Sequence, residues 1–316
     1  MPTADLNLES IEKAARVIDP VFRNSPQFVD DSLSAALGRN LLLKIETVNP
    51  VRSFKGRGAD FFMRSLHSQR SVVCASAGNF GQAMAYAGRS VGIPVEVFVP
   101  VDVNPIKLAR IKSFGATVTV AGRDFEGAKE NARAAARQTG RLFVEDGEED
   151  AITEGAGTIG VELFASGPLD TIVVPVGDGA LITGVATWIK AHSPRTRIVG
   201  VCAAGAPAMA ESWRTGRVIA TQSSETIADG MAVRVPVAKA VDRIGKLVDD
   251  MVLVDDAALI EAMRLVFSTL GLLLEPSGAA GLAAIRFHSL PGERIATILT
   301  GSNVHPGMLP ELVTPS

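Results

Sequence analysis

Short runs of residues that favour β-strands alternate with longer alanine-rich runs that favour helices along almost the whole chain. The strand-like runs are nearly continuous in valine and isoleucine, which is typical of parallel strands buried on both faces. Regular alternation of such strands with helices predicts an α/β fold with parallel sheets. The predicted strands are residues 41–45, 72–75, 95–100, 117–121, 142–144, 171–176, 198–202, 251–254 and 295–299. The predicted helices include residues 11–18, 81–91, 106–114, 125–139, 179–191 and 256–270.

The number of strands fits two sheets better than one. The chain has 316 residues, 47% of them hydrophobic, which suits one large or two medium cores. An acidic run at residues 145–150, Glu-Asp-Gly-Glu-Glu-Asp, is interpreted as a solvated boundary between the two sheets.

Composition excludes several classes of partner. The 31 basic and 34 acidic residues give a net charge of −3, no basic run is present, and aromatic residues are only 5%, so nucleic-acid binding is not expected. The two cysteines, Cys74 and Cys202, cannot build a disulfide framework or a zinc cluster. No apolar stretch is long enough to span a membrane, and the first residues lack a signal pattern, so a cytoplasmic protein is predicted.

Lys55 has an unusual setting for a lysine. It lies between Phe54 and the glycines Gly56 and Gly58, shortly after a predicted strand, whereas surface lysines usually lie among polar residues on a helix. A lysine that must become a neutral amine and form an imine needs a tight, partly apolar environment. The sequence therefore predicts a chemical role for Lys55.

Three further segments combine small residues with a strand end. They are residues 76–82 (Ser-Ala-Gly-Asn-Phe-Gly-Gln), 174–181 (Val-Pro-Val-Gly-Asp-Gly-Ala-Leu) and 298–304 (Ile-Leu-Thr-Gly-Ser-Asn-Val). Free backbone N–H groups at a helix start bind anions, and glycine lets a backbone approach a phosphate closely. Each segment taken alone could also be an ordinary turn.

Together these segments resemble those of the fold-type II pyridoxal-phosphate enzymes, which include threonine and serine dehydratases, serine racemase and threonine synthase. The pattern Ser-Phe-Lys-x-Arg-Gly-Ala at residues 53–59 resembles the cofactor-lysine segment of this family, and residues 155–162, 226–233 and 274–280 resemble segments of the dehydratases. The resemblance covers nearly the whole chain. It implies a two-domain, tryptophan synthase beta-like fold with helix-flanked, parallel-rich sheets. Residues 1–70 and 149–316 would form a large pyridoxal-phosphate-binding domain, with a small domain, residues 71–148, inserted.

The resemblance also implies roles for individual residues. Lys55 would carry pyridoxal 5'-phosphate as a Schiff base, and Phe54 beside it would also bind the cofactor. Asn79 would contact the ring hydroxyl of the cofactor, and Thr300 would face the pyridine nitrogen. Glu275 either belongs to the cofactor site or is a charge near a helix cap. The residues implied for the cofactor phosphate are Gly177, Asp178, Gly179, Ala180 and Leu181. The residues implied for the substrate are Ser76, Ala77, Gly78 and Asn79.

Three positions depart from ordinary threonine dehydratases. Asp178 replaces a glycine, and a carboxylate beside a phosphate must point away or find a cationic partner. Phe80 replaces a histidine and Arg52 replaces a glycine. Both side chains are expected to face the site, where Phe80 makes it more apolar and Arg52 could recognise an acidic group. The substrate is therefore not necessarily threonine.

The chain also contains a glycine pattern that is associated with nicotinamide cofactors. Gly155, Gly157 and Gly160 match the pattern G-x-G-x-x-G. That pattern binds dinucleotides only directly after a buried strand, and residues 150–154 do not read as one. We therefore predict no nicotinamide cofactor.

No metal site is predicted either. His67, His192, His288 and His305 have no metal-ligand spacing. Some relatives bind a metal through a glutamate after a V-x-G-V pattern, but here Cys202 follows, which is a poor ligand for a hard cation.

The residue types favour elimination over racemisation. Serine racemase has a serine at the position of Ala77, and alanine cannot deliver the proton that racemisation needs on the second face. The neutral hydroxyl of Thr300 does not force the ring nitrogen to hold a proton, which suits β-elimination. The predicted enzyme is an ammonia-lyase (dehydratase) in which Lys55 removes the Cα proton. It would convert a β-hydroxy-α-amino acid, such as L-threonine, L-serine or a β-substituted analogue, to a 2-oxo acid and ammonia.

Other functions stay open at this point. A threonine synthase-like or other β-elimination or replacement enzyme is one, and an amino-acid racemase is another. A non-catalytic βα binding protein is a third, and the combination of Lys55, Asn79 and Thr300 argues against it. The expected partner is a small amino-acid substrate, and a homodimer is implied only by the family resemblance.

Overall fold

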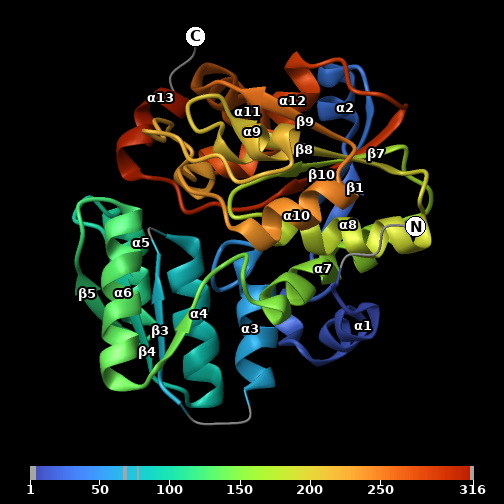
Figure 1. The fold of residues 1–316 in the computed structure, drawn as a ribbon. Coiled ribbons are helices and arrows are strands. Elements are labelled where there is room, and N and C mark those ends of the chain that lie inside the picture. Colours follow the sequence, from blue (N-terminus) through green and yellow to red (C-terminus); the bar gives the residue numbers. More distant parts are fainter. Residues whose placement is uncertain (1–4, 67–69, 77, 314–316) are drawn as a thin grey trace.

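The computed structural model describes residues 5–66, 70–76 and 78–313, and its strands form two sheets (Figure 1). His67 and Ala77 lie outside the described residues. The larger sheet has the order β1-β2-β10-β7-β8-β9 and the smaller one β5-β4-β3-β6. All pairings are parallel except that of β1 with β2. The α/β prediction with two parallel-rich sheets is therefore confirmed.

The strands of the larger sheet are β1 (Gln27–Val29), β2 (Asn40–Ile45), β7 (Thr171–Pro175), β8 (Arg197–Ala203), β9 (Asp250–Val254) and β10 (Arg294–Leu299). Those of the smaller sheet are β3 (Val72–Ala75), β4 (Val95–Val99), β5 (Thr117–Val120) and β6 (Leu142–Val144). Each predicted strand is present. The sequence missed only β1, which has three residues and leaves Phe28 and Val29 exposed, so it carries no buried apolar pattern.

Helices cover both faces of the larger sheet. On one face pack α7 (Asp150–Phe164), α8 (Ala180–His192) and α10 (Ala238–Leu247). On the other pack α2 (Asp31–Leu37), α11 (Asp256–Leu270) and α12 (Pro276–Phe287). The remaining helical segments are α1 (Leu8–Val17), η1 (Pro20–Phe22), α3 (Lys55–Ser65), α4 (Asn79–Val91), α5 (Pro105–Ser113), α6 (Phe125–Thr139), α9 (Ala208–Thr215), η2 (Asp229–Met231), η3 (Pro306–Met308) and α13 (Leu309–Val313). None of the described helices is long and apolar enough to cross a membrane.

The smaller sheet lies inside the predicted insertion, residues 71–148. Around it lie α4, α5 and α6, in the lower left of Figure 1. Helix α3 precedes the insertion but packs against α4, and Phe61 and Phe62 of α3 share a core with strands β3 and β4. The two-domain division at these boundaries stays a prediction.

The three glycines of the G-x-G-x-x-G pattern lie inside helix α7, which begins at Asp150. A Cβ at Gly155 would lie 2.7 Å from the carbonyl oxygen of Arg57, and one at Gly157 would lie 3.0 Å from that of Gly184. The glycines therefore let α7 approach α3 and α8 closely. The pattern serves helix packing, and a loop, not a strand, comes directly before the helix.

A buried ionic network, which we call the Arg57 cluster (Lys44, Glu46, Arg57 and Glu162), joins β2, α3 and α7. The Arg57 guanidinium donates to Glu46 at 2.8 Å and to Glu162 at 2.6 Å, and its side chain is 0% exposed. Lys44 pairs with Glu162 and donates to the carbonyl oxygen of Ser25 at 2.8 Å. Burial lowers the pKa of Lys44. The cluster contains two cations and two carboxylates, so its charges cancel.

Candidate active site

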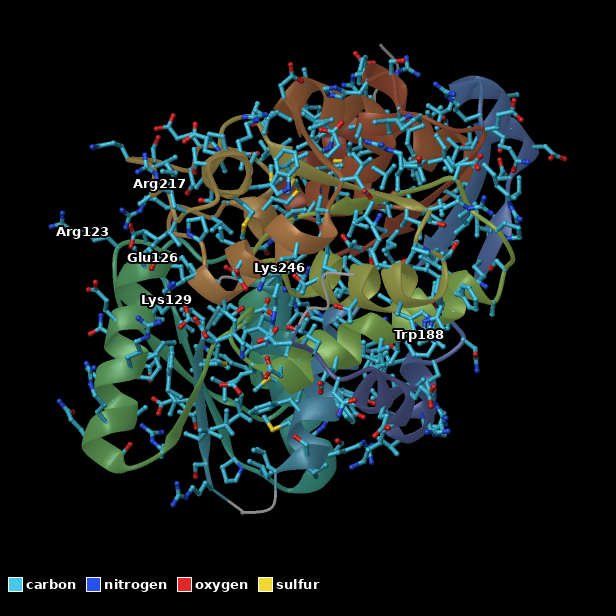
Figure 2. All side chains as sticks on the ribbon, turned by 45° about the vertical axis from the view of Figure 1, so that its right-hand side comes forward. Arg123, Glu126, Lys129, Trp188, Arg217 and Lys246 are labelled. Atoms are coloured by element: carbon cyan, nitrogen blue, oxygen red, sulfur yellow. The ribbon has the colours of Figure 1, made fainter. Side chains whose placement is uncertain are left out.

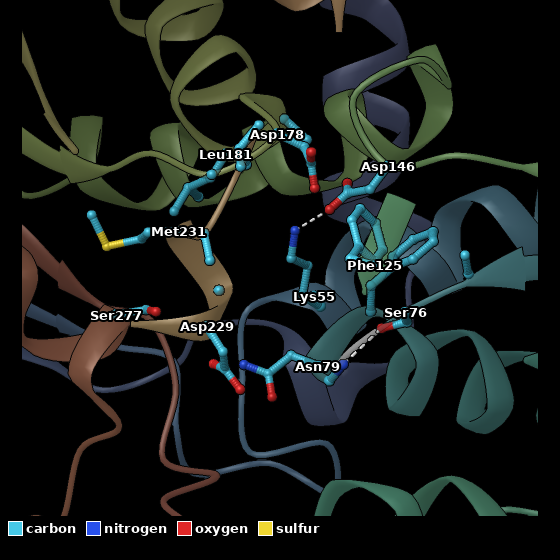
Figure 3. A pocket seen from close by; sticks show the side chains of 18 of the residues that line it. Lys55, Ser76, Asn79, Phe125, Asp146, Asp178, Leu181, Asp229, Met231 and Ser277 are labelled. Carbon is cyan, nitrogen blue, oxygen red and sulfur yellow. Dashed lines mark hydrogen bonds and ion pairs between the residues drawn. The ribbon is translucent and has the colours of Figure 1, made fainter. Parts of the chain in front are cut away.

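Most of the predicted site residues line one pocket between the two sheets, with a cavity volume of about 430 Å³ (Figure 3). The lining includes Phe54, Lys55, Ser76, Gly78, Asn79, Phe80, Gly177, Asp178, Gly179, Ala180, Leu181, Glu275 and Thr300. Residues far apart in the sequence thus come together as the motifs implied. Arg52 does not join them: it is exposed, has a positive φ of 55°, and is not among the lining residues. The structure therefore gives no support to recognition of an acidic group by Arg52.

Lys55 is the first residue of α3, and its backbone is fixed by the larger sheet. The N–H group of Phe54 donates to the carbonyl oxygen of Thr300 at 3.0 Å, just beyond the end of β10. The Nζ atom lies 4.8 Å from the centre of the Phe54 ring and makes an ion pair with Asp146. The lysine amine thus lies in a partly apolar pocket, as its sequence setting predicted, and it has one carboxylate partner, which the sequence did not predict.

Asp146 corrects the interpretation of the acidic run at residues 145–150. Its side chain is only 6% exposed and lines the pocket instead of facing solvent. The fold turns the chain inward here because β6 ends at Val144, beside β3, and α7 begins at Asp150. One carboxylate oxygen pairs with Lys55, and the other, Oδ1, has no hydrogen-bond partner. Sequence reasoning missed this residue because an acidic run usually marks a solvated loop.

Asp178 lies on the same side of the pocket as Asp146, with both carboxylates directed toward Lys55 (Figure 3). Burial, and then the negative charge of Asp146, raise the pKa of Asp178 to about 7, although Lys55 opposes the shift. The sequence offered two outcomes, a side chain that points away or one with a cationic partner. The structure shows a third, a carboxyl group whose pKa is raised by burial and by the nearby Asp146 carboxylate.

The turn around Asp178 is shaped to hold an anion. It connects β7 to α8, whose first residue is Ala180, and no side chain caps the free N–H groups of that helix. Gly179 has φ +93°, which favours glycine. A Cβ at Gly177 would lie 2.4 Å from the carbonyl oxygen of Gly230, so this position has no room for a side chain. A phosphate group fits such a helix start.

A second ionic group closes the opposite part of the pocket. Asn79 donates to Glu275, which is 2% exposed and lies 3.3 Å from the ammonium of Lys107. Lys107 also binds Asp229 at 2.7 Å, linking α5 with η2. Burial alone lowers the pKa of Lys107, but Glu275 and Asp229 outweigh it, so the net shift is upward. Glu275 thus lines the pocket, and so does Lys107, which no local sequence signal marked.

The hydroxyl groups of Ser76 and Thr300, which both line the pocket, have different hydrogen-bond roles. The Ser76 hydroxyl oxygen accepts hydrogen bonds from the N–H groups of Gly78 at 3.0 Å and Gly81 at 2.8 Å, which shapes the start of α4. Thr300 is 4% exposed and donates to the carbonyl oxygen of Ser277 at 3.3 Å. The Thr300 hydroxyl therefore lies in the pocket at the end of β10.

Comparison with known proteins decides the family. Residues 18–301 match the family described as pyridoxal-phosphate dependent enzyme. The chain belongs to this family.

Relatives of this enzyme include both lyases and racemases. It is 32% identical to an L-threonine ammonia-lyase of Thermotoga maritima, over 98% of this chain and 78% of the relative. It is also 32% identical to a serine racemase of Oryza sativa subsp. indica, over 96% of this chain and 92% of the relative. The crystal structure of a threonine deaminase from T.th. matches with a TM-score of 0.89 and 32% identity, covering 96% of this chain and 98% of that one. The protein is thus a pyridoxal-phosphate-dependent enzyme of the dehydratase and racemase group.

The pocket fits this cofactor on its own geometry. An enclosed lysine amine lies beside the aromatic ring of Phe54, and an uncapped helix start lies in the same cavity. The buried hydroxyl of Ser277 has no hydrogen-bond partner and also lines the cavity. Among the described residues, no group of three or more His, Cys, Asp or Glu side chains could hold a metal ion.

Proposed function

We propose that this protein is an ammonia-lyase that removes a β-substituent and the α-amino group from an α-amino acid, leaving a 2-oxo acid. Pyridoxal phosphate supplies an electron sink for such a reaction. Lys55 would hold the cofactor covalently and later take the Cα proton. Gly177, Gly179 and the start of α8 would hold its phosphate, and Thr300 would face its ring nitrogen.

The observation that carries the proposal is the placement of the acid–base groups around Lys55. Asp146, the carboxylate partner of Lys55, is in direct contact with Nζ, so we assign it to the same side of the reacting carbon as Lys55. Racemisation needs a second proton carrier on the opposite side, and residue 77 on the substrate-binding segment is an alanine. One-sided proton removal is sufficient for elimination.

The chain's own residues would do the remaining work. The N–H groups at the start of α4, organised by Ser76, would bind the substrate carboxylate. Asn79 is held between Glu275 and Asn303, whose Nδ2 donates to the Asn79 Oδ1 at 2.9 Å. These two contacts fix the orientation of the Asn79 amide, which would face the cofactor ring. Phe80 adds an apolar surface that helps to exclude water.

The test is an absorption spectrum of the purified protein with pyridoxal phosphate, before and after addition of L-threonine, L-serine and their β-substituted analogues, with 2-oxo acid assayed alongside. We expect a cofactor band that is absent from Lys55→Ala protein, and 2-oxo acid from at least one substrate. Inverted amino acid without 2-oxo acid would instead establish a racemase, and a cofactor band retained by Lys55→Ala would refute the role of Lys55. The homodimer and the cytoplasmic location remain predictions, and light scattering would measure the subunit number.

A further inference from the structure

The proposed elimination needs an acid as well as a base, because a β-hydroxyl group leaves readily only when it receives a proton. The described lining of the pocket contains no histidine, and its cations are Lys55, Lys107 and Lys129. Lys55 is the base, and Lys107 is paired with two carboxylates. Lys129, on α6 beside Glu126 (Figure 2), lies 2.9 Å from that carboxylate and 3.1 Å from Glu145. Among these residues, a carboxyl group is therefore the strongest candidate for the acid.

Asp178 is the carboxyl group whose position suits this role. It lines the cavity together with Asp146, and both are directed toward the Lys55 amine (Figure 3). The substrate Cα must come within hydrogen-bond reach of Lys55 Nζ, and a β-oxygen is only two bonds from Cα. A substituent that leaves on the side of Lys55 therefore departs close to these two groups. Asp146 is already ion-paired with Lys55, whereas Asp178 makes no ion pair with any described residue.

The charges around Asp178 favour its protonated form. Burial, and then the carboxylate of Asp146, raise its pKa to about 7, and Glu145 acts in the same direction. Lys55 and Lys129 oppose the shift. A phosphate bound at the turn after β7 would add negative charge and so raise the pKa of Asp178 further. An acid with a pKa near the working pH still carries its proton in part and also gives it up readily.

We infer that Asp178 is a catalytic general acid that protonates the departing β-hydroxyl group of the substrate. This inference rests on the proposed elimination. Lys55 takes the Cα proton, and the C–H electron pair forms the Cα–Cβ double bond. The Cβ–O bond breaks with its electron pair on oxygen, which takes the proton of Asp178 and leaves as water. The resulting enamine takes up water and releases its nitrogen as ammonia, which leaves a 2-oxo acid.

Asp146 is placed to return the proton to Asp178. After the elimination, Lys55 carries one extra proton and Asp178 lacks one. One oxygen of Asp146 contacts the Lys55 amine, and the other, Oδ1, is buried without a hydrogen-bond partner. Transfer of a proton from Lys55 to Asp146, and from Asp146 to Asp178, restores both groups for the next turnover.

The experiment compares initial-rate kcat/KM values of the holoenzyme for a β-hydroxy substrate, L-serine or L-threonine, and for β-chloro-L-alanine, whose chloride leaves without a proton. Asp178→Asn should lower kcat/KM for the hydroxy substrate by about a hundredfold or more, the usual size of general acid catalysis. The value for β-chloro-L-alanine should change far less. Glu148→Gln removes a negative charge from the neighbouring acidic run at an exposed position outside the lining, and should leave both values unchanged.

Infrared spectroscopy gives a second readout that needs neither turnover nor cofactor. Between about pH 6 and about pH 8, the cofactor-free protein should lose a protonated-carboxyl band, and Asp178→Asn should lack that component of the difference spectrum. Absence of the component in the wild type would overturn the inference. If Asp178→Asn binds no cofactor, the pH profiles of the wild type decide. Activity on the hydroxy substrate should fall above neutral pH more steeply than activity on β-chloro-L-alanine, and identical profiles would refute the acid.

The two hypotheses fail in different ways. A cofactor-loaded protein that yields no 2-oxo acid from any amino acid, β-chloro-L-alanine included, would refute the ammonia-lyase itself. Equal losses on both substrates in Asp178→Asn would show only a structural or cofactor-binding role, and no loss on the hydroxy substrate would assign the proton to another donor, such as the cofactor phosphate. Either result, or a wild type that eliminates chloride but no hydroxyl group, would refute only the role of Asp178.

Discussion

Two groups of buried charges lie close together in this protein, and they are built differently. In the Arg57 cluster, two cations meet two carboxylates, and each guanidinium nitrogen donates to an oxygen acceptor. Around Lys55, one cation faces Asp146 and Asp178, and an oxygen of Asp146 has no partner. A balanced cluster stabilises one arrangement of the chain. The group around Lys55 lies in a cavity and keeps an unpartnered carboxylate oxygen, which is available to a ligand.

The largest expected effect comes from breaking the balanced cluster. Arg57→Met would leave Glu46 and Glu162 buried without their main partner, and should lower the free energy of unfolding by about 3–5 kcal/mol. Urea denaturation of the cofactor-free protein measures this. A loss below about 1 kcal/mol would mean that the cluster is not the structural element that its geometry suggests.

Lys107→Met tests the ion pairs of the pocket itself. The substitution removes a cation from a pocket that is already lined by several carboxylates. Glu275 would lose its cation in a buried position, whereas Asp229 is partly exposed and can be hydrated. We expect a loss of roughly 2–3 kcal/mol in the same denaturation experiment, smaller than for Arg57→Met. The added variant Glu275→Gln should recover part of this loss, and a failure to recover any would contradict the pairing.

Asp178→Asn should stabilise the protein, in contrast to the two preceding substitutions. The folded-state pKa of Asp178 is raised to about 7, so between its unfolded value of 3.8 and about 7 the native protein binds more protons than the unfolded chain. Stability is therefore lost as pH rises through that window. The variant cannot ionise and should be more stable than the wild type at pH 8 by roughly 1–3 kcal/mol, with no such gain at pH 3. Melting curves at the two pH values measure it, and a pH-independent difference would contradict the shifted pKa.

The smallest expected effect on stability comes from an exposed ion pair, which serves as a reference for the buried groups. Arg16 and Glu12 lie 3.5 Å apart on α1, with side chains 72% and 51% exposed. Glu12→Gln should change stability by less than about 0.5 kcal/mol, and high salt should abolish even that. A larger change would show that solvent exposure does not separate this pair from the buried groups.

The sequence predicted the backbone segments that form the pocket better than it predicted the charged side chains that line it. The lysine segment, the turn after β7 and the end of β10 are marked by local patterns, and the fold brings them to one cavity. Asp146 and Lys107 carry no such pattern, because their roles depend on how the two sheets face each other. Arg52 was misplaced for a similar reason: its position beside Ser53 and Lys55 does not fix where its side chain points, and a positive φ turns it to solvent.

The position of β10 has a consequence for how the protein is made. This strand is the last of the described strands along the chain, yet it lies between β2 and β7 in the middle of the larger sheet. During synthesis, the edges of β2 and β7 that will pair with β10 therefore stay unpaired until more than a hundred further residues have followed β7. Completion of the larger sheet, and with it the placement of Thr300, is a late and long-range folding event. The unfinished chain is consequently the form most exposed to aggregation.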